Sequence, residues 1–164
     1  MTTTLVRTRL ATTHDVTALV AMHRRCSPDT LHRRFHVPVH DVPPRTVERL
    51  VAPAGGWSIV AEQCEDLVGH ACVGPLSAGV LEVGLVVEDA HQGTGIGARL
   101  TRDLALEASR RGFSTMVCLA QPDNDSVVRT VRRAGLDCMP VLEDGLLEVR
   151  VALPSRRGGL QRPA

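Results

Sequence analysis

The stretch "VVEDAHQGTGIGARL", residues 86–100, decides the fold of this chain, because a strand-like run, a glycine-rich turn and a helical pattern follow one another within it. Gly93, Gly95 and Gly97 stand two residues apart directly before the helical pattern. Glycine tolerates positive φ and a close ligand, while a helix N-terminus offers unpaired N–H groups and a partial positive charge. The stretch therefore predicts a loop that binds an anion through its backbone amides.

Hydrophobic periodicity predicts an order of strands and helices around this loop. Three strand-like runs at short intervals come before it, which favours an antiparallel meander. The expected strands cover residues 4–11, 57–63, 67–76, 80–88, 113–121 and 145–153, and the expected helices residues 15–26, 27–35, 44–51, 95–111 and 124–135. The clearest helix is 95–111, where Ile96, Leu100, Leu104 and Ala108 recur at every fourth position.

Length and composition fit one globular domain. The chain has 164 residues, of which 43% are hydrophobic and 23% charged, enough to bury a core. We expect the domain to span residues 1–153 and residues 154–164 to form a disordered tail. A net charge of +1 and an aromatic content of 2% argue against a nucleic-acid partner. The sequence shows neither a secretory signal nor a run of 18 apolar residues, so we expect a cytoplasmic protein without a membrane segment.

The cysteines and histidines do not form a recognisable ligand pattern. The five cysteines are odd in number and contain no CxxC pair; they are Cys26, Cys64, Cys72, Cys118 and Cys138. We expect buried, reduced thiols, as is typical of a cytosolic protein. The seven histidines have no ligand spacing with cysteine or carboxylate, so no metal site is predicted.

The glycine loop allows two other interpretations. Residues 93–98 also fit the G-x-G-x-x-A dinucleotide pattern. That pattern belongs to the first βα turn and needs an acidic residue about 20 positions later. Here several strands precede the glycines, and residues 113–121 contain no acid. The remaining alternative is a purely structural turn with no ligand.

The loop and its flanks resemble the GNAT acyltransferase superfamily. Its fingerprint is Gln or Arg, two residues, Gly, one residue, then Gly or Ala, and residues 92–97 satisfy every position. Residues 85–87 stand where the family has its strand-4 L-x-V, and Asn124 and the "RRAGL" of 132–136 match further family positions. The resemblance covers residues 5–153. The segments "CSPDTLHRRF" and "LEVGLVVEDAHQGTGIG" are most similar to protein-lysine acetyltransferase domains.

The resemblance implies a mixed α/β GNAT fold, in which a mostly antiparallel sheet is splayed between strands 4 and 5 and flanked by helices. It implies acetyl-CoA as acyl donor and a primary amine as acceptor, either a protein lysine or a small molecule, with direct attack in a ternary complex. The residues that it assigns to acetyl-CoA are Leu85, Val86, Val87, Gln92, Gly93, Thr94, Gly95, Ile96, Gly97, Ala98 and Asn124.

Each of these groups has an expected role. The amides of the glycine loop would hold the pyrophosphate, the backbone of 85–87 would pair with the pantetheine arm, and Val87 N–H would polarise the thioester carbonyl. Asn124 would bond a pantetheine amide, or cap a loop or helix instead. The candidates for the 3′-phosphate are Arg99, Arg102, Arg129 and Arg132.

Glu82 is the candidate general base, because the resembling enzymes place a Glu at this position of the strand. We expect it to face a cleft in the sheet, where desolvation makes a carboxylate a stronger base. Glu62, His70 and His91 are weaker candidates, and we expect His70 to lie in the sheet and His91 beside the cofactor loop. A solvated Glu82 on a strand is the alternative.

One departure from the family concerns the acid. Many members carry a Tyr four residues before the Gly of a "GF" pair, where it protonates the departing thiolate. Here that position is Val131, the pair is Gly135 and Leu136, and the chain has no Tyr. Cys118 is the nearest substitute, although a structural thiol is the plainer interpretation.

The missing Tyr keeps a second class of function open, a non-catalytic acetyl-CoA sensor or partner-binding module. Acetylation of an antibiotic or a polyamine differs only in the acceptor. The sequence leaves open both the acceptor and whether the protein is a monomer or a homodimer.

Overall fold

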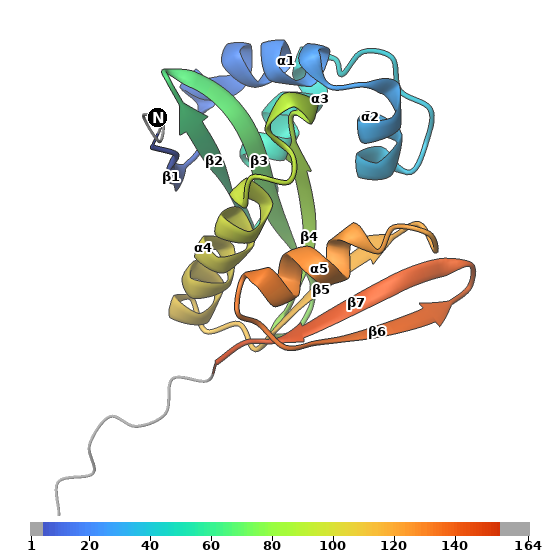
Figure 1. Ribbon diagram of the computed structural model, residues 1–164. Helices are drawn as coiled ribbons and strands as arrows, with labels where there is room; N and C mark the ends of the chain where they lie inside the picture. The colour runs from blue at the N-terminus through green and yellow to red at the C-terminus, as the bar shows by residue number, and fades with distance from the viewer. Residues whose placement is uncertain (1–4, 155–164) are drawn as a thin grey trace, which may run out of the picture.

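The computed structural model describes residues 5–154 and contains one seven-stranded sheet with helices on both faces (Figure 1). The strands are β1 (Arg7–Leu10), β2 (Trp57–Gln63), β3 (Asp66–Ser77), β4 (Val80–Val87), β5 (Thr115–Ala120), β6 (Cys138–Glu143) and β7 (Leu146–Ala152). The helices are α1 (Val16–Arg25), α2 (Pro28–Phe35), α3 (Pro44–Val51), α4 (Ile96–Arg110) and α5 (Ser126–Arg133), with short 3-10 turns η1 (Thr13–Asp15) and η2 (Asp89–His91).

The sheet has the order β1-β2-β3-β4-β5-β7-β6, and only the β4–β5 pair is parallel. That pair is short, since it extends from Val80 opposite Thr115 to Glu82 opposite Val117. Beyond Glu82 the two strands separate, and β5, β7 and β6 diverge from β4 beneath α5 (Figure 1). The structure thus confirms a mostly antiparallel sheet that is splayed between its fourth and fifth strands.

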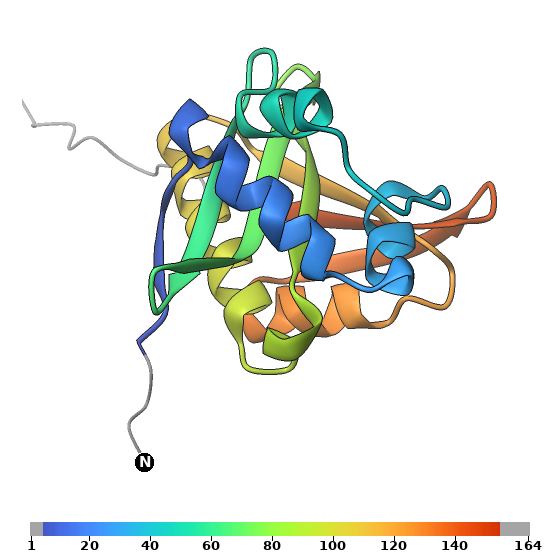
Figure 2. The ribbon, with the colours of Figure 1, turned by 90° about the horizontal axis from the view of Figure 1, so that it is seen from above.

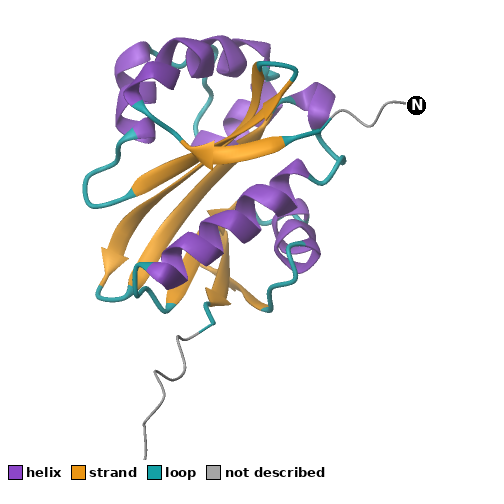
Figure 3. Cartoon of the chain, turned by 90° about the vertical axis from the view of Figure 1, so that its left-hand side faces the viewer, coloured by secondary structure: helices purple, strands orange, loops and turns teal. Residues whose placement is uncertain are grey.

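Two helical layers enclose the sheet (Figure 3). α1 crosses one face of the sheet with α2 and α3 beside it (Figure 2), and α4 and α5 cover the other face. The core is correspondingly double, with Leu19 and Met22 fully buried on the α1 side and Leu100 and Leu104 on the α4 side. Because each such side chain contributes about 1.5–3 kcal/mol on burial, both layers fix the sheet between them.

Helix α4 begins and ends at glycines. Its N-cap, Gly95, has φ +94°, and Gly112 beyond its end has φ +88°, a conformation that a Cβ disfavours. Between them, apolar residues recur at every fourth position, so that one face of the helix is apolar and packs against the core. The helix predicted for 95–111 is therefore confirmed to within one residue at each end.

Three expectations need correction or lie beyond the structure. The strand β6 is missing from the predicted elements, because Pro140 interrupts it and most of its side chains are exposed, so it shows no alternation. Cys26 and Cys72 are buried free thiols as expected, but Cys64 is exposed in the turn between β2 and β3. Of the predicted tail, 154–164, all but Pro154 lies outside the described residues.

Candidate functional site

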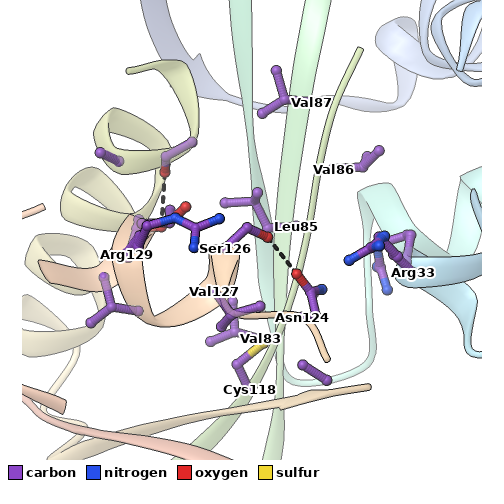
Figure 4. A pocket seen from close by; sticks show the side chains of 18 of the residues that line it. Arg33, Val83, Leu85, Val86, Val87, Cys118, Asn124, Ser126, Val127 and Arg129 are labelled. Carbon is purple, nitrogen blue, oxygen red and sulfur yellow. Dashed lines mark hydrogen bonds between the residues drawn. The ribbon is translucent and has the colours of Figure 1, made fainter. Parts of the chain in front are cut away.

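A cavity of about 740 Å³ opens where β4 and β5 part. Its walls come from α2, β4, the glycine loop, the start of α4, β5 and α5 (Figure 4). Most of the residues predicted to bind the cofactor line it: Leu85, Val86, Val87, Gln92, Gly93, Gly95, Gly97, Ala98 and Asn124. Elements far apart in the sequence therefore bring the predicted site together in one place.

The glycine loop presents free backbone amides at the start of α4. The first hydrogen bond of that helix runs from Arg99 N–H to Gly95 O at 3.0 Å, so the N–H groups of residues 96–98 precede it and lack a partner within the helix. Gly93 has φ +75°, and a Cβ built on Gly93 or Gly95 would meet no atom within 4 Å. The outer side of the loop is open, whereas the Ile96 and Ala98 side chains are buried behind it.

Side chains tie this loop to α2. Gln92 Nε2 donates to Val87 O and to Thr30 Oγ1, both at 3.0 Å. Asp89 accepts from Ser27 N–H at 2.8 Å, and Ser27 in turn caps α2 by accepting from Thr30 N–H. Thr94 Oγ1 donates to the His91 carbonyl, so polar side chains hold the loop in shape while its glycine amides stay exposed.

Within the described residues, the edge of β4 beyond Glu82 pairs with no strand on the side of the gap, and the Val87 carbonyl there accepts from the Gln92 side chain. Glu88 N–H donates to Val68 O on β3, and backbone groups alternate in direction along a strand. The N–H and C=O of Val87 and Leu85 consequently point into the gap, and those of Val86 point toward β3. The Val86 side chain packs in the core under α1 and α2.

Asn124 is 6% exposed and lies in the loop before α5, where its Oδ1 accepts from the Ser126 hydroxyl (Figure 4). Its backbone N–H donates to Gln121 O at 2.9 Å, and its carbonyl accepts from Val127 N–H. It therefore has a structural role in the loop and also lines the cavity.

Glu82 lies on β4 and lines the cavity at the point where the strands part. Its side chain is exposed, so the expectation of a desolvated carboxylate is wrong. The weaker candidates lie elsewhere or are neutral. Glu62 forms an ion pair with Arg9 at 2.6 Å, and His70 lies in β3, where burial lowers its pKa to about 3. His91 sits in η2 at the edge of the cavity.

The four arginines considered for a phosphate behave differently. Arg99 donates to Val6 O at 2.7 Å and Arg102 to Ala134 O at 3.3 Å, so backbone carbonyls engage both. Arg132 is exposed and does not line the cavity. Arg129 on α5 is also exposed and does line the cavity (Figure 4).

Cys118 and Val131 occupy the inner wall. Cys118, on β5, is half-buried and lies close to Val83 (Figure 4). Burial raises the pKa of its thiol to about 11; the Arg34 charge opposes this rise, and the Glu82 carboxylate adds to it. Val131, at the position of the family Tyr, is 5% exposed and packs in the core cluster of α4 and α5.

Three basic residues of α2 and its C-cap line the cavity but were not among the predicted site residues: Arg33, Arg34 and His36. Arg33 pairs with Asp29 at 3.0 Å. The only sequence signal was the "SPDTLHRRF" segment that resembles lysine acetyltransferases, which marks the helix without indicating where its side chains point.

Two further findings concern the described part of the chain. Within residues 5–154, no three His, Cys, Asp or Glu side chains come close enough together to hold a metal ion. None of the helices in the same range combines the length and the apolar content that crossing a membrane requires.

Comparison with known proteins agrees with this geometry. The model of the acetyltransferase (GNAT) family matches residues 9–136. No curated protein matches the sequence. Among solved structures, the GNAT domain of S. lividans PAT aligns with a TM-score of 0.82 and 23% identity over 90% of each chain.

Two similar structures contain acetyl-CoA. The putative acetyltransferase yncA from Salmonella typhimurium, with acetyl-CoA, has a TM-score of 0.72 and 20% identity over 97% of this chain and 99% of its own. The phosphinothricin acetyltransferase from Sinorhizobium meliloti, in complex with acetyl-CoA, has a TM-score of 0.73 and 16% identity over 97% and 93%. At these identities the likeness establishes the fold.

Proposed function

This chain belongs to the acetyltransferase (GNAT) family, and from that membership we propose that it transfers the acetyl group of acetyl-CoA to a primary amine by direct attack in a ternary complex. The observation that carries the proposal is the opening between β4 and β5, where the backbone edge of Leu85 and the Val87 N–H face a cavity that the glycine loop borders. The acetyl-CoA in two structures of the same fold supports this choice of donor.

The glycine loop and α5 would hold the nucleotide end of acetyl-CoA. The free amides of residues 93–98 suit the pyrophosphate, because helix N-termini favour negative charge. A phosphate can approach these amides because the space beside Gly93 and Gly95 is open, with no atom within 4 Å of where a Cβ would lie. Arg129 is the arginine of the four with both exposure and a place in the cavity wall, so we assign the 3′-phosphate to it.

The edge of β4 would pair with the pantetheine arm as an added strand does. Asn124 would bond an amide of the arm from the opposite wall. We assign the thioester carbonyl to the N–H of Leu85 in place of Val87, because a strand rises about 3.3 Å per residue and Val87 is thus about 16 Å from Glu82. Leu85 is about 10 Å away, within reach of the Glu82 side chain and an amine between them.

Glu82 would take a proton from the acceptor amine, directly or through a water molecule. The amine nitrogen then bonds to the thioester carbon, the carbonyl oxygen gains negative charge opposite Leu85 N–H, and the C–S bond breaks. With Val131 where the family Tyr would stand, the sulfur leaves as thiolate and takes its proton from solvent. A thiol with a pKa of about 8.5 is an adequate leaving group near neutral pH.

The experiment is a thiol-release assay with acetyl-CoA, propionyl-CoA and succinyl-CoA across small amines and lysine peptides. We expect release of CoA thiol that depends on both acetyl-CoA and an amine. The absence of any Tyr favours one second candidate, a sensor or partner-binding module that binds acetyl-CoA without turnover. Tight acetyl-CoA binding by calorimetry without thiol release from any amine would favour that candidate.

A further inference from the structure

The guanidinium of Arg34 lies against the backbone of β4 inside the cavity. A Cβ built on Gly84 would overlap its Cζ and both terminal nitrogens, so the group rests directly on Gly84. Gly84 is paired with Cys72 on β3, and Arg34 Nη2 donates to Cys72 Sγ at 3.2 Å. The Arg34 side chain therefore extends from α2 into the cavity and places its positive charge beside β4.

Among the residues that the structure describes, this cation has no anionic partner. Within residues 5–154, no carboxylate forms an ion pair with Arg34. Its Nε is buried without a hydrogen-bond partner, the Cys72 sulfur is a weak acceptor, and the Phe35 ring lies 5.0 Å from its Cζ. A part-buried charge that is not paired costs free energy, so an anion beside Arg34 would be bound favourably.

Among residues 5–154, Glu82 is the carboxylate in the same cavity, and it forms no ion pair with Arg34. His70 on β3 and His23 on α1 are buried next to each other on the same side of the sheet as Arg34, with their ring centroids 6.4 Å apart. Burial, the largest cause, lowers the pKa of both imidazoles, and the charge of Arg34 lowers both further. The neighbouring Arg33 differs, because Asp29 neutralises it.

Arg34 and Glu82 occupy the same side of β4. Alternate residues of a strand share a face, and Glu82 and Gly84 are two positions apart, about 7 Å. A small molecule that places an amine near Glu82 and an anion near Arg34 would need these groups separated by a few bonds, with a charged hydrogen bond of about 2.8 Å at each end.

We propose that the acceptor is a small primary amine bearing a carboxylate, and that Arg34 binds this carboxylate while Glu82 faces the amine. The inference rests on the acetyl transfer proposed above and names the class of its acceptor, an amino acid. A planar guanidinium binds a carboxylate through two parallel hydrogen bonds. The same charge disfavours polyamines, whose second ammonium group would approach Arg34.

The test compares acceptors that differ only in the carboxylate, leucine against leucinamide and β-alanine against β-alaninamide. The kcat/KM for thiol release should be at least about tenfold higher for the acid of at least one pair. The amides have more neutral amine at pH 7, so amine basicity cannot produce this preference. Arg34→Met should reduce the acid-to-amide ratio at least about tenfold, Arg34→Lys should retain part of it, and Arg33→Met is the matched control that keeps it.

Binding separates failure of this inference from failure of the proposed reaction. In calorimetry with CoA present, N-acetylleucine should bind more tightly than N-acetylleucinamide, and Arg34→Met should remove the difference. If no amine supports thiol release but the Arg34-dependent binding is observed, the result contradicts the proposed reaction and supports the anion site at Arg34. Equal kcat/KM for acids and amides, or equal losses for both in Arg34→Met, would overturn the inference, as would turnover confined to lysine peptides.

Discussion

At the scale of single residues, Glu82 carries the proposed chemistry. We predict that Glu82→Gln lowers kcat by roughly 10² to 10⁴-fold, the usual cost of a lost general base. The acetyl-CoA affinity should change little, because the base acts on the amine and the amide keeps the size of the side chain. Steady-state kinetics together with calorimetry measure both quantities.

Glu62→Gln is the matched control for this prediction. Its carboxylate is held by Arg9 at 2.6 Å and does not line the cavity, so turnover by the folded variant should stay within about twofold of the parent. Unchanged turnover in Glu82→Gln at pH 7 would move the role to an ordered water or another group.

The second residue-scale prediction concerns the leaving thiolate. Burial raises the pKa of Cys118 to about 11, so this thiol stays protonated at neutral pH and is a weaker acid than a thiol of pKa about 8.5. We expect kcat/KM to show one ascending limb with pH and then to stay level to about pH 9.5. Cys118→Ala should keep that shape. A bell-shaped profile whose alkaline limb vanishes in a folded Cys118→Ala variant would show that Cys118 is the acid.

At the scale of elements, a substitution at the start of α4 should affect helix stability and ligand binding in opposite ways. A methyl group at Gly97 would lie 3.4 Å from Thr130 Cγ2 and 3.8 Å from side-chain atoms of Leu85 and Val87, inside the cleft. We predict that Gly97→Ala weakens acetyl-CoA binding at least about tenfold, while helix propensity, which favours Ala by up to about 1 kcal/mol, preserves or raises the melting temperature. If calorimetry finds the same acetyl-CoA affinity in Gly97→Ala as in the parent, Gly97 does not border the donor site.

Elements with a strong local signal could be predicted from the sequence, and those without one could not. The fourfold apolar spacing of α4 and its glycine ends place that helix to within one residue. β6 lacks such a signal, because it is an edge strand whose side chains mostly face solvent and whose Pro140 breaks the β pattern. Its position depends on pairing with β7, which no local pattern encodes.

The candidate site divides in the same way. The glycine loop is contiguous in sequence, so its spacing was sufficient to indicate its place at the cavity. The exposure of Glu82 depends on where β5 departs from β4. The position of Arg34 depends on how α2 packs against Gly84. Neither the exposure of Glu82 nor the position of Arg34 can be predicted from one contiguous segment of sequence.

At the scale of the whole molecule, Arg9 joins β1, η1 and β2 through Asp15 at 2.7 Å and Glu62 at 2.6 Å. The hydrogen bonds from Arg9, more than any other cause, lower the pKa of Asp15 to about 2. A carboxyl with a lowered folded-state pKa stabilises the fold above its unfolded value of about 3.9 and loses that contribution as pH falls toward 2.

We therefore predict that Asp15→Asn lowers the free energy of unfolding by about 2 kcal/mol at pH 7, and that the difference shrinks between about pH 4 and pH 2. Urea denaturation at several pH values measures it. Asp41→Asn is the control, since Asp41 and its partner Arg24 are more than half exposed, and it should change the free energy of unfolding by under about 0.5 kcal/mol. Equal effects of the two substitutions would contradict the assignment.

The short contact between β4 and β5 also connects the two parts of the sheet, β1 to β4 on one side and β5, β7 and β6 on the other. Three residue pairs, from Val80–Thr115 to Glu82–Val117, are the whole strand pairing between the two parts of the sheet, with α4 and α5 in contact behind them. A donor molecule that pairs with β4 on one side and touches Asn124 on the other would add a second junction beyond Glu82. The substrate would then complete the sheet in place of protein hydrogen bonds, and loss of product after each turnover would reopen the junction through which the next donor enters.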